Sequence, residues 1–304
     1  TDLTNGKVRL QNKYQFINLE YFDILWELTA NGIKIQDGKL EEIKIEPGEQ
    51  KEVYIPFNLT KSELTTEYHI KIASVLSKDM PWAKKGHIVA WDQFKIILDS
   101  HIEMKDIISE IPAIKIMEST KSIKIIGKDF EIIIGKISGA IESFVFNNIE
   151  LVSSPLIPNF WRAPTDNDIG EVDLDEFKDN PQIDYNWKSA SKNRKVVKIS
   201  TEDLNPNTIC IKVQFDIINS EKHLETIYTV YGSGDIFIEN LFTPNKNLIR
   251  FGMQMSIPGE FNMMNWYGRG PHESMMDRKT GAAVGTYSGL VTELIHPYIR
   301  PQEN

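Results

Sequence analysis

Residues 21–36 are YFDILWELTANGIKIQ, and this stretch decides the fold class. Apolar and polar residues alternate on both sides of the dipeptide Asn31-Gly32. A period of two places one face of a β-strand on a core and the other face in water. Asn-Gly favours tight hairpin turns, because both residues tolerate positive φ. The segment therefore predicts a two-stranded β-hairpin, with Trp26 as a core residue of a sandwich.

The same alternation recurs through the first hundred residues. Further strands are expected at residues 8–11, 43–46, 69–72 and 91–98, with turns at Asp37-Gly38 and Pro47-Gly48. Short strands at a spacing of about 8–12 residues are typical of a β-sandwich. We therefore expect a sandwich that ends near Leu98.

A second and larger β region is expected after a mixed stretch around Pro112. Its strands are predicted at residues 122–126, 130–134, 141–146, 195–200, 208–215, 225–231, 235–242, 250–257 and 261–267. Gly232-Ser233-Gly234 supplies a hairpin turn between two of these strands, and residues 171–181 are the best candidate for a short helix. The pattern thus predicts an all-β protein of two sandwiches, the second being the larger.

Composition and charge exclude several classes of function. The formal net charge is −9, which argues against polyanionic partners such as nucleic acids. The single cysteine, Cys210, rules out an internal disulfide and Cys₄ or Cys₂His₂ zinc sites, and it is expected to be a small buried strand residue. No apolar run approaches the roughly 20 residues that a membrane span needs. Because the chain ends at Asn304 without a closing strand, we expect the natural protein to continue. The start at Thr1 in place of Met indicates a processed or excised form.

Polar and aromatic side chains are concentrated in the irregular segment 159–170, NFWRAPTDNDIG. Trp161 offers a flat apolar face for stacking on a sugar ring, and its polar neighbours offer hydrogen bonds to hydroxyl groups. Those neighbours are Arg162, Asp166, Asn167 and Asp168. A structural interpretation stands beside this one, in which Arg162 pairs with an aspartate and pins the loop. A third is a cation held by the two aspartates.

A second such segment is 266–278, WYGRGPHESMMDR, where two glycines and a proline force an irregular backbone. Its candidate side chains are Trp266, Tyr267, Arg269, His272, Glu273, Asp277 and Arg278. The functional interpretation is a sugar-facing or interface loop. The structural interpretation is a buried arginine–carboxylate network that holds two strands together.

These segments resemble blocks of the glycoside hydrolase family 2 β-galactosidases. Residues 159–170 are similar to that family's RAP-x-DND block, and residues 266–282 to its GRGPHE block. HPYIRPQEN at 296–304 resembles its PQEN block, and GHIVAWDQF at 86–94 resembles the last strand of the domain after the catalytic barrel. Four blocks in the family's order are far more specific than any single one.

The resemblance implies an immunoglobulin-like β-sandwich at 1–100, a linker at 101–114 and a β-supersandwich similar to galactose mutarotase at 115–304. It also implies that the catalytic glutamates lie in a barrel upstream of Thr1, so no catalytic residue is assigned to this chain. The intact protein would be a retaining β-galactosidase acting on terminal β-D-galactosides, and this chain alone is predicted to be inactive. The sequence departs from the family pattern at Ser274 and Met275, where Asn and Tyr are common, so sugar or subunit contacts there would differ.

The expected partners are a galactoside or oligosaccharide, the barrel of the same polypeptide and further copies in a homo-oligomer, with no nucleic acid and no membrane. No cofactor or metal is expected in this chain, and any Mg²⁺ or Na⁺ of the intact enzyme would be bound mainly by the barrel. A bacterial cytoplasmic or periplasmic location stays open, as do β-glucuronidase and β-mannosidase specificities. Two alternatives are a stand-alone carbohydrate-binding module using Trp161 and Trp266, and a mutarotase-type epimerase using His272 and Glu273. Adjacent residues on a strand point to opposite faces, which argues against the second alternative.

Overall fold

The computed structural model describes residues 2–41, 43–59, 66–98, 111–164, 168, 184–218 and 220–295. The chain divides into two compact units, of which the first holds Thr1–Ile102 and Asn262–Ile295. The described part of the second unit lies within Glu103–Phe261. The expected boundaries at 1–100, 101–114 and 115–304 stay a prediction. They assign Asn262–Ile295 to the last domain, whereas in the structure this segment packs with the first unit.

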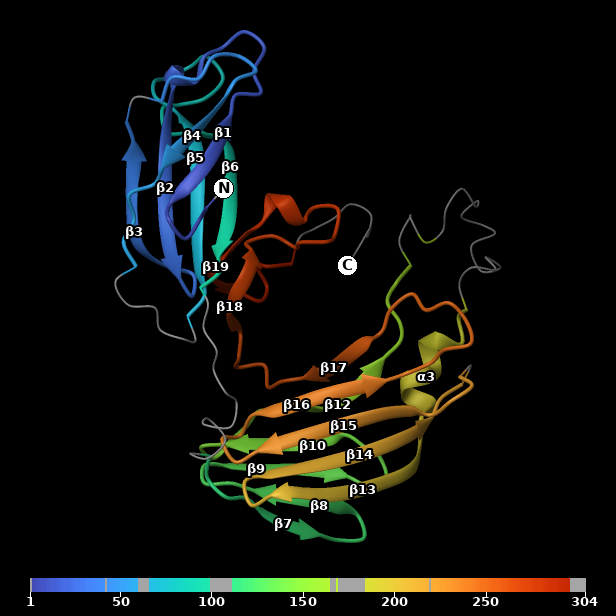
Figure 1. The fold of residues 1–304 in the computed structure, drawn as a ribbon. Helices are drawn as coiled ribbons and strands as arrows, with labels where there is room; N and C mark the ends of the chain where they lie inside the picture. Colours follow the sequence, from blue (N-terminus) through green and yellow to red (C-terminus); the bar gives the residue numbers. More distant parts are fainter. Residues whose placement is uncertain are drawn as a thin grey trace. The chain divides into compact units, whose positions relative to one another are not determined.

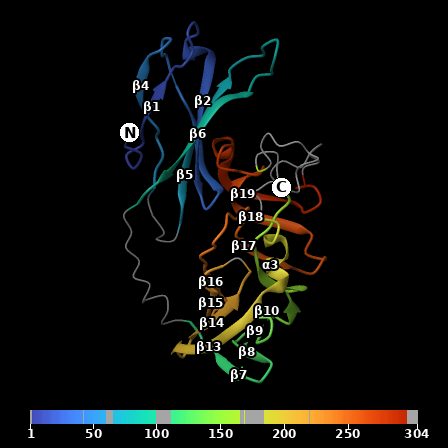
Figure 2. The same cartoon turned by 90° about the vertical axis from the view of Figure 1, so that its right-hand side faces the viewer.

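The described residues of the first unit form eight strands and two short 3₁₀ helices, and the strands are labelled in Figure 1. These elements are β1 (Lys7–Gln11), η1 (Leu19–Tyr21), β2 (Phe22–Ala30), β3 (Ile33–Leu40), β4 (Gln50–Tyr54), β5 (Tyr68–Leu76), β6 (Ile88–Ile96), β18 (Met263–Gly270), η3 (Lys279–Gly281) and β19 (Ala283–Leu290). One antiparallel sheet has the order β3-β2-β5-β6, and a second pairs β1 with β4. A separate hairpin pairs β18 with β19 and lies beside the end of β6 in both views (Figures 1 and 2).

The hairpin expected from residues 21–36 is confirmed. Ala30 pairs with Ile33, and the turn residues Asn31 and Gly32 have φ of 47° and 78°. Trp26 is 6% exposed and belongs to a core that both sheets supply, as predicted. Alternate residues of β2 and β5 fill this core, namely Ile24, Trp26 and Leu28 with Tyr68, Ile70 and Ile72.

Two expectations in this unit are wrong. Residues 43–46 form no strand, although Ile45 is buried at 2% exposure. The Ile45 carbonyl accepts hydrogen bonds from the Asn12 amide side chain and the Leu19 backbone instead of from a ladder. Asp37 and Gly38 form no turn and lie inside β3. A Cβ on Gly38 would stand 2.8 Å from Trp26 Nε1, so this glycine lets the indole pack against the strand.

The second unit consists of two antiparallel sheets around one core. Its elements are β7 (Lys115–Glu118), β8 (Ser122–Ile126), β9 (Phe130–Gly135), β10 (Ile141–Phe146), β11 (Ile149–Glu150), β12 (Ser154–Asn159), α3 (Trp187–Asn193), β13 (Lys195–Asn205), β14 (Thr208–Asp216), β15 (Leu224–Tyr231), β16 (Ile236–Leu241) and β17 (Gly252–Ser256). The seven-stranded sheet has the order β17-β12-β10-β9-β8-β7, with β11 paired to β10, and the four-stranded sheet has the order β13-β14-β15-β16. The turn at Gly232-Ser233-Gly234 joins β15 to β16 as predicted. The all-β sandwich fold is therefore confirmed.

Isoleucines dominate the core of the second unit. Side chains of β8 and β9 pack with alternate residues of β14, whose Ile209, Ile211, Val213 and Phe215 are all 0% exposed. Cys210 lies between them in sequence and is also buried, as expected for a small strand residue. The helix α3 adds Trp187, which is 0% exposed and was not predicted to lie in a helix. The helix expected at 171–181 lies outside the described residues.

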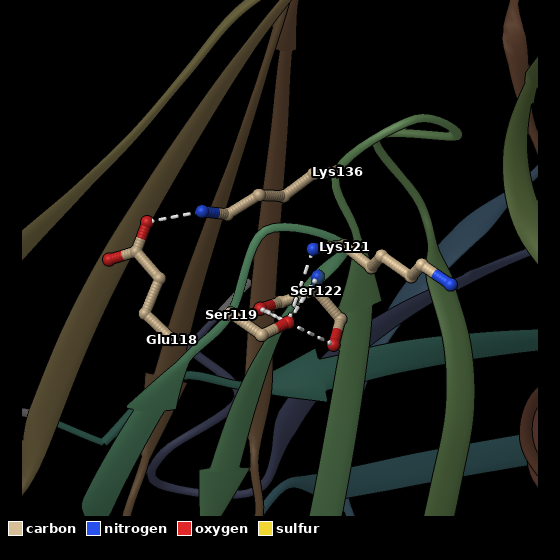
Figure 3. A network of polar contacts seen from close by, with 5 residues as sticks. All are labelled: Glu118, Ser119, Lys121, Ser122 and Lys136. Atoms are coloured by element: carbon tan, nitrogen blue, oxygen red, sulfur yellow. Dashed lines mark hydrogen bonds and ion pairs between the residues drawn. The ribbon is translucent and has the colours of Figure 1, made fainter.

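A polar turn connects β7 to β8 at the edge of the larger sheet (Figure 3). The Ser119 hydroxyl accepts hydrogen bonds from the backbone N–H groups of Lys121 and Ser122, at 3.2 and 3.0 Å. Beside it, Lys136 Nζ donates to Glu118 Oε1 at 2.5 Å. A serine that bonds the backbone two and three residues ahead closes a tight turn, so this network fixes the register of the edge strand.

Candidate functional site

The first candidate loop leaves β12 at Asn159 and is held by its own polar side chains. Asn159 Oδ1 accepts a hydrogen bond from the Trp161 backbone N–H at 3.1 Å, which closes an Asx-turn. Arg162 binds both carboxylate oxygens of Asp168, at 2.5 and 3.1 Å, and also donates to the Ala163 carbonyl. The two side chains are 24% and 21% exposed. The predicted pairing of Arg162 with an aspartate is therefore confirmed, with Asp168 as the partner.

Trp161 lies at the edge of the core and not on an open surface. It is half-buried, packs against the core cluster of the second unit, and its ring centroid lies 5.3 Å from that of Tyr185. Asp166 and Asn167 lie outside the described residues. Both oxygens of Asp168 accept hydrogen bonds from Arg162. Among the residues that the structure describes, no group of three His, Cys, Asp or Glu side chains is arranged to hold a metal ion.

The second candidate segment spans the end of β18 and the connection to β19. The Trp266 indole N–H donates to the Arg269 carbonyl at 3.1 Å, and its ring lies 5.4 Å from that of Tyr287. Arg269 Nη1 donates to the backbone carbonyls of Lys279 and Ala282, at 3.0 and 2.7 Å. Arg269 thus fastens the 3₁₀ turn η3 to β18.

The remaining candidates of this segment are exposed or half-exposed. Arg278 pairs with Glu273 at 2.7 Å, and these side chains are 51% and 30% exposed. His272 and Asp277 lie on the surface. The described contacts differ from the expected buried arginine–carboxylate network, since Arg269 binds carbonyl groups and the Arg278–Glu273 pair is solvated. The structure groups these residues with the first unit and groups Trp161, Arg162 and Asp168 with the second.

The structure also shows a polar contact set that sequence reasoning missed, in which the β18–β19 hairpin meets the sheet β3-β2-β5-β6. The Tyr267 hydroxyl donates to Glu67 Oε2 at 3.0 Å, and Glu67 also pairs with Lys95. Lys95 and Tyr267 hold the pKa of the Glu67 carboxyl below its usual range, while burial and Glu67 raise the pKa of Tyr267 to about 12. The tyrosine therefore stays protonated and the glutamate ionised at neutral pH.

Two further contacts complete this set, which we call the hairpin dock. Gln93 of β6 donates to the Val284 carbonyl at 2.8 Å and accepts from the Val284 N–H at 2.7 Å. The Thr286 hydroxyl donates to the Asn31 carbonyl at 3.2 Å. A side-chain amide that bonds both groups of one backbone residue imitates a strand partner. The hairpin is thus fixed in register on β6.

Each unit also contains a groove. In the first unit a groove of about 540 Å³ lies between β1 and β6, with Arg9, Lys13, Tyr14, Trp91 and Asp92 among its lining residues. In the second unit a groove of about 410 Å³ is lined by apolar side chains of β10, β12, β16 and the segment around β17. None of the sequence candidates that the structure describes lines either groove.

The Arg162–Asp168 pair should stabilise the second unit measurably. Replacing Arg162 with alanine leaves a half-buried carboxylate without its bidentate partner, so we expect the unfolding free energy to fall by about 1–3 kcal/mol. Urea unfolding followed by circular dichroism measures this loss. The matched control is Lys212→Ala, which removes an exposed pair with Glu202 in the same unit and should cost within about 0.5 kcal/mol. Equal losses in the two variants would contradict a structural role for Arg162.

Fold and loops together define a two-unit β-sandwich protein whose polar loops are fastened by arginine. In the described part of the chain, no helix is long and apolar enough to span a membrane. A family model described as beta galactosidase small chain matches residues 126–304, and one described as beta-galactosidase, domain 4, matches residues 8–97. The chain belongs to the beta galactosidase small chain family, which confirms the resemblance to β-galactosidases inferred from the sequence.

Curated relatives agree with this assignment. A β-galactosidase of Priestia megaterium is 32% identical over 99% of this chain and 28% of its own length. One from Halalkalibacterium halodurans is 27% identical over 98% of this chain and 29% of its own length, and one from Clostridium acetobutylicum is 30% identical over 92% and 30%. The chain thus spans less than a third of the length of these relatives.

Proposed function

We propose that this chain serves as the non-catalytic β-sandwich part of a β-galactosidase that hydrolyses terminal β-D-galactosides. The observation that carries the proposal is the paired family match, since two β-galactosidase models together cover residues 8–97 and 126–304. Retaining hydrolysis needs two carboxylates about 5–5.5 Å apart on either side of the glycosidic bond. We assign these groups to a barrel outside this chain, together with any Mg²⁺ or Na⁺ that the enzyme uses.

The contribution of this chain would be rigid support, subunit contacts and part of the wall of the sugar site. The segment around Arg162 suits such a wall, because the bidentate pair ties Arg162 to Asp168. The GRGPHE segment suits it as well, because Arg269 fastens η3 to β18. Rigid loops present their remaining polar atoms to a ligand without an ordering cost.

Complementation tests this proposal directly. The chain is mixed with the Priestia megaterium relative from which the matching 28% has been deleted, and hydrolysis of o-nitrophenyl β-D-galactoside is followed. We expect turnover in the mixture and none above buffer with either part alone. The control is the same mixture with a chain carrying Phe160→Ala, which truncates a fully buried side chain of the second unit's core and is expected to reduce turnover. Turnover by this chain alone, or two folded parts that associate without turnover, would contradict the proposal.

Calorimetry separates this role from that of an independent carbohydrate-binding module. Trp161 and Trp266, the two stacking candidates, each pack beside another aromatic ring. We therefore expect no heat beyond dilution when galactose or lactose is titrated into the isolated chain. Saturable binding that Trp161→Ala or Trp266→Ala removes without unfolding would favour the binding-module function instead.

A further inference from the structure

His69 is a buried titratable group in the sheet that carries the hairpin dock. It lies in β5 with 6% of its surface exposed, and its Nδ1 atom has no hydrogen-bond partner among the described residues. His69 is paired across the sheet with Thr29 on one side and Lys95 on the other, and Thr29 is paired in turn with Lys34. A neutral imidazole can be buried at this position at little cost. A charged imidazolium would lose its hydration there, which is unfavourable.

The hairpin contacts surround His69 on this face of the sheet. They fall at Asn31, two residues beyond Thr29, at Glu67, two residues before His69, and at Gln93, two residues before Lys95. Thr29 beside it is also buried, at 5% exposure. Because side chains two apart share a face of a strand, the Glu67 and Gln93 contacts lie on the same face as His69, and the Asn31 contact is made by a backbone carbonyl in the adjoining turn.

Charged groups of both signs lie around His69. Lys95 lies opposite it on β6, and Arg269 of β18 is near enough to repel a charged imidazole. Among the described residues, the Glu67 carboxylate is the anion that favours a charged imidazole, and it is already shared between Lys95 and the Tyr267 hydroxyl. Lys34, further along the row, pairs with Asp37. Protonation would thus place a third cation around one occupied carboxylate.

We propose that the β18–β19 hairpin is a pH-sensitive latch, docked on its sheet while His69 is neutral and loosened when His69 takes up a proton. The inference does not depend on galactosidase activity, because it concerns the docking of one element within the first unit.

The direction of the pH dependence follows from the sign of the shift. Burial, the largest effect, holds the pKa of His69 below its ordinary value of 6.5 in the docked state, with smaller contributions from Lys95 and Arg269 and against the opposing effect of Glu67. The undocked state therefore binds more protons, so docking is strongest above pH 6.5 and weakens as the pH falls below it. Glu67 acts in a lower window, because its depressed pKa preserves its contribution until the pH falls below its ordinary value of 4.5. The effects of His69 and Glu67 on docking can thus be distinguished by the pH range in which each appears.

Hydrogen exchange of the intact chain tests the latch. Protection of the β18 and β19 amides, corrected for the intrinsic pH dependence of exchange, is compared at pH 7.5 and pH 5.5. We expect a severalfold fall in hairpin protection, while β2 and β5 amides keep theirs. In His69→Asn the fall should disappear, and His69→Gln provides a second neutral variant. His87→Asn, which replaces an exposed histidine of the same unit, should leave the fall unchanged.

Three outcomes would overturn the latch. One is hairpin protection that is equal at both pH values in the unmodified chain. Another is a fall that persists undiminished in both His69 variants. The third is a parallel loss of protection in β2 and β5, which would mean that the whole unit opens and not the hairpin alone.

Discussion

Replacing Trp187 with alanine is expected to lower the unfolding free energy of the second unit by about 3–5 kcal/mol. The indole is 0% exposed and packs against Phe160 and Phe242, with ring centroids 5.7 and 5.9 Å away. Its N–H also donates to the Asn247 carbonyl at 2.9 Å. Alanine would leave a cavity and remove that donor, and the surrounding rings cannot collapse fully into the space. Urea unfolding, with hydrogen exchange of β14 amides to identify the transition, measures the loss.

The control for this variant is Phe237→Ala in the same unit. Phe237 lies on β16 with 56% of its surface exposed, so its truncation should change stability by about 0.5 kcal/mol or less. A Trp187→Ala loss as small as that of the control would show that α3 does not anchor the aromatic cluster.

Gly32→Ala should weaken both the β2–β3 turn and the hairpin dock. Gly32 has φ of +78°, where a side chain costs about 1–2 kcal/mol. In addition, an ideal Cβ there would lie 2.5 Å from Thr286 Oγ1, 2.6 Å from the Thr286 nitrogen and 2.8 Å from the Gly285 carbonyl carbon. Backbone atoms of β19 cannot move aside as a flexible side chain can, so overpacking adds roughly 1–3 kcal/mol. Hydrogen exchange of β19 should show lost protection.

Gly48→Ala is a closely matched control for Gly32→Ala. Gly48 has φ of +80°, yet no atom lies within 4 Å of the position its Cβ would take. The two variants therefore share the backbone strain and differ in the contact with the hairpin. If Gly48→Ala reduced β19 protection as much as Gly32→Ala, the close approach of Gly32 to β19 would not matter for docking.

Local patterning was sufficient for most strands of both sandwiches. Residues 21–36, 122–126 and 208–215 carry their alternation within the segment, so burial of one face follows from the sequence itself. Strand β12 contains Pro155 and Pro158, which suggest a loop, and β19 holds two glycines and few large apolar residues. Those strands form because neighbouring strands pair with them, although their own sequence pattern does not indicate a strand.

Where the sequence pattern gave a wrong prediction, a contact with a residue elsewhere in the chain determined the structural role. Gly38 looked like half of a turn, but it makes room for the Trp26 indole. Ile45 looked like a strand residue, but the Asn12 side chain satisfies its carbonyl from 33 positions away. Neither role can be inferred from the residues that neighbour Gly38 or Ile45 in the sequence.

The candidate loops divide in the same way. The pairing of Arg162 with Asp168 spans six positions and could be inferred from one motif. The hairpin dock joins Tyr267 to Glu67 across 200 positions and Thr286 to Asn31 across 255, so no local signal could have indicated it. Motifs thus located the loops, while the structure showed what fastens them.

Cys210 provides a built-in chemical probe for the opening of the second unit. It is the sole cysteine of the chain, and it is buried in β14. Burial raises the pKa of its thiol, and the thiolate is the form that attacks disulfide reagents. A reagent such as DTNB can therefore react appreciably when the sheet around β14 opens. Because the first unit holds no cysteine, the rate of the DTNB colour reaction measures the opening of the second unit alone. No label has to be introduced.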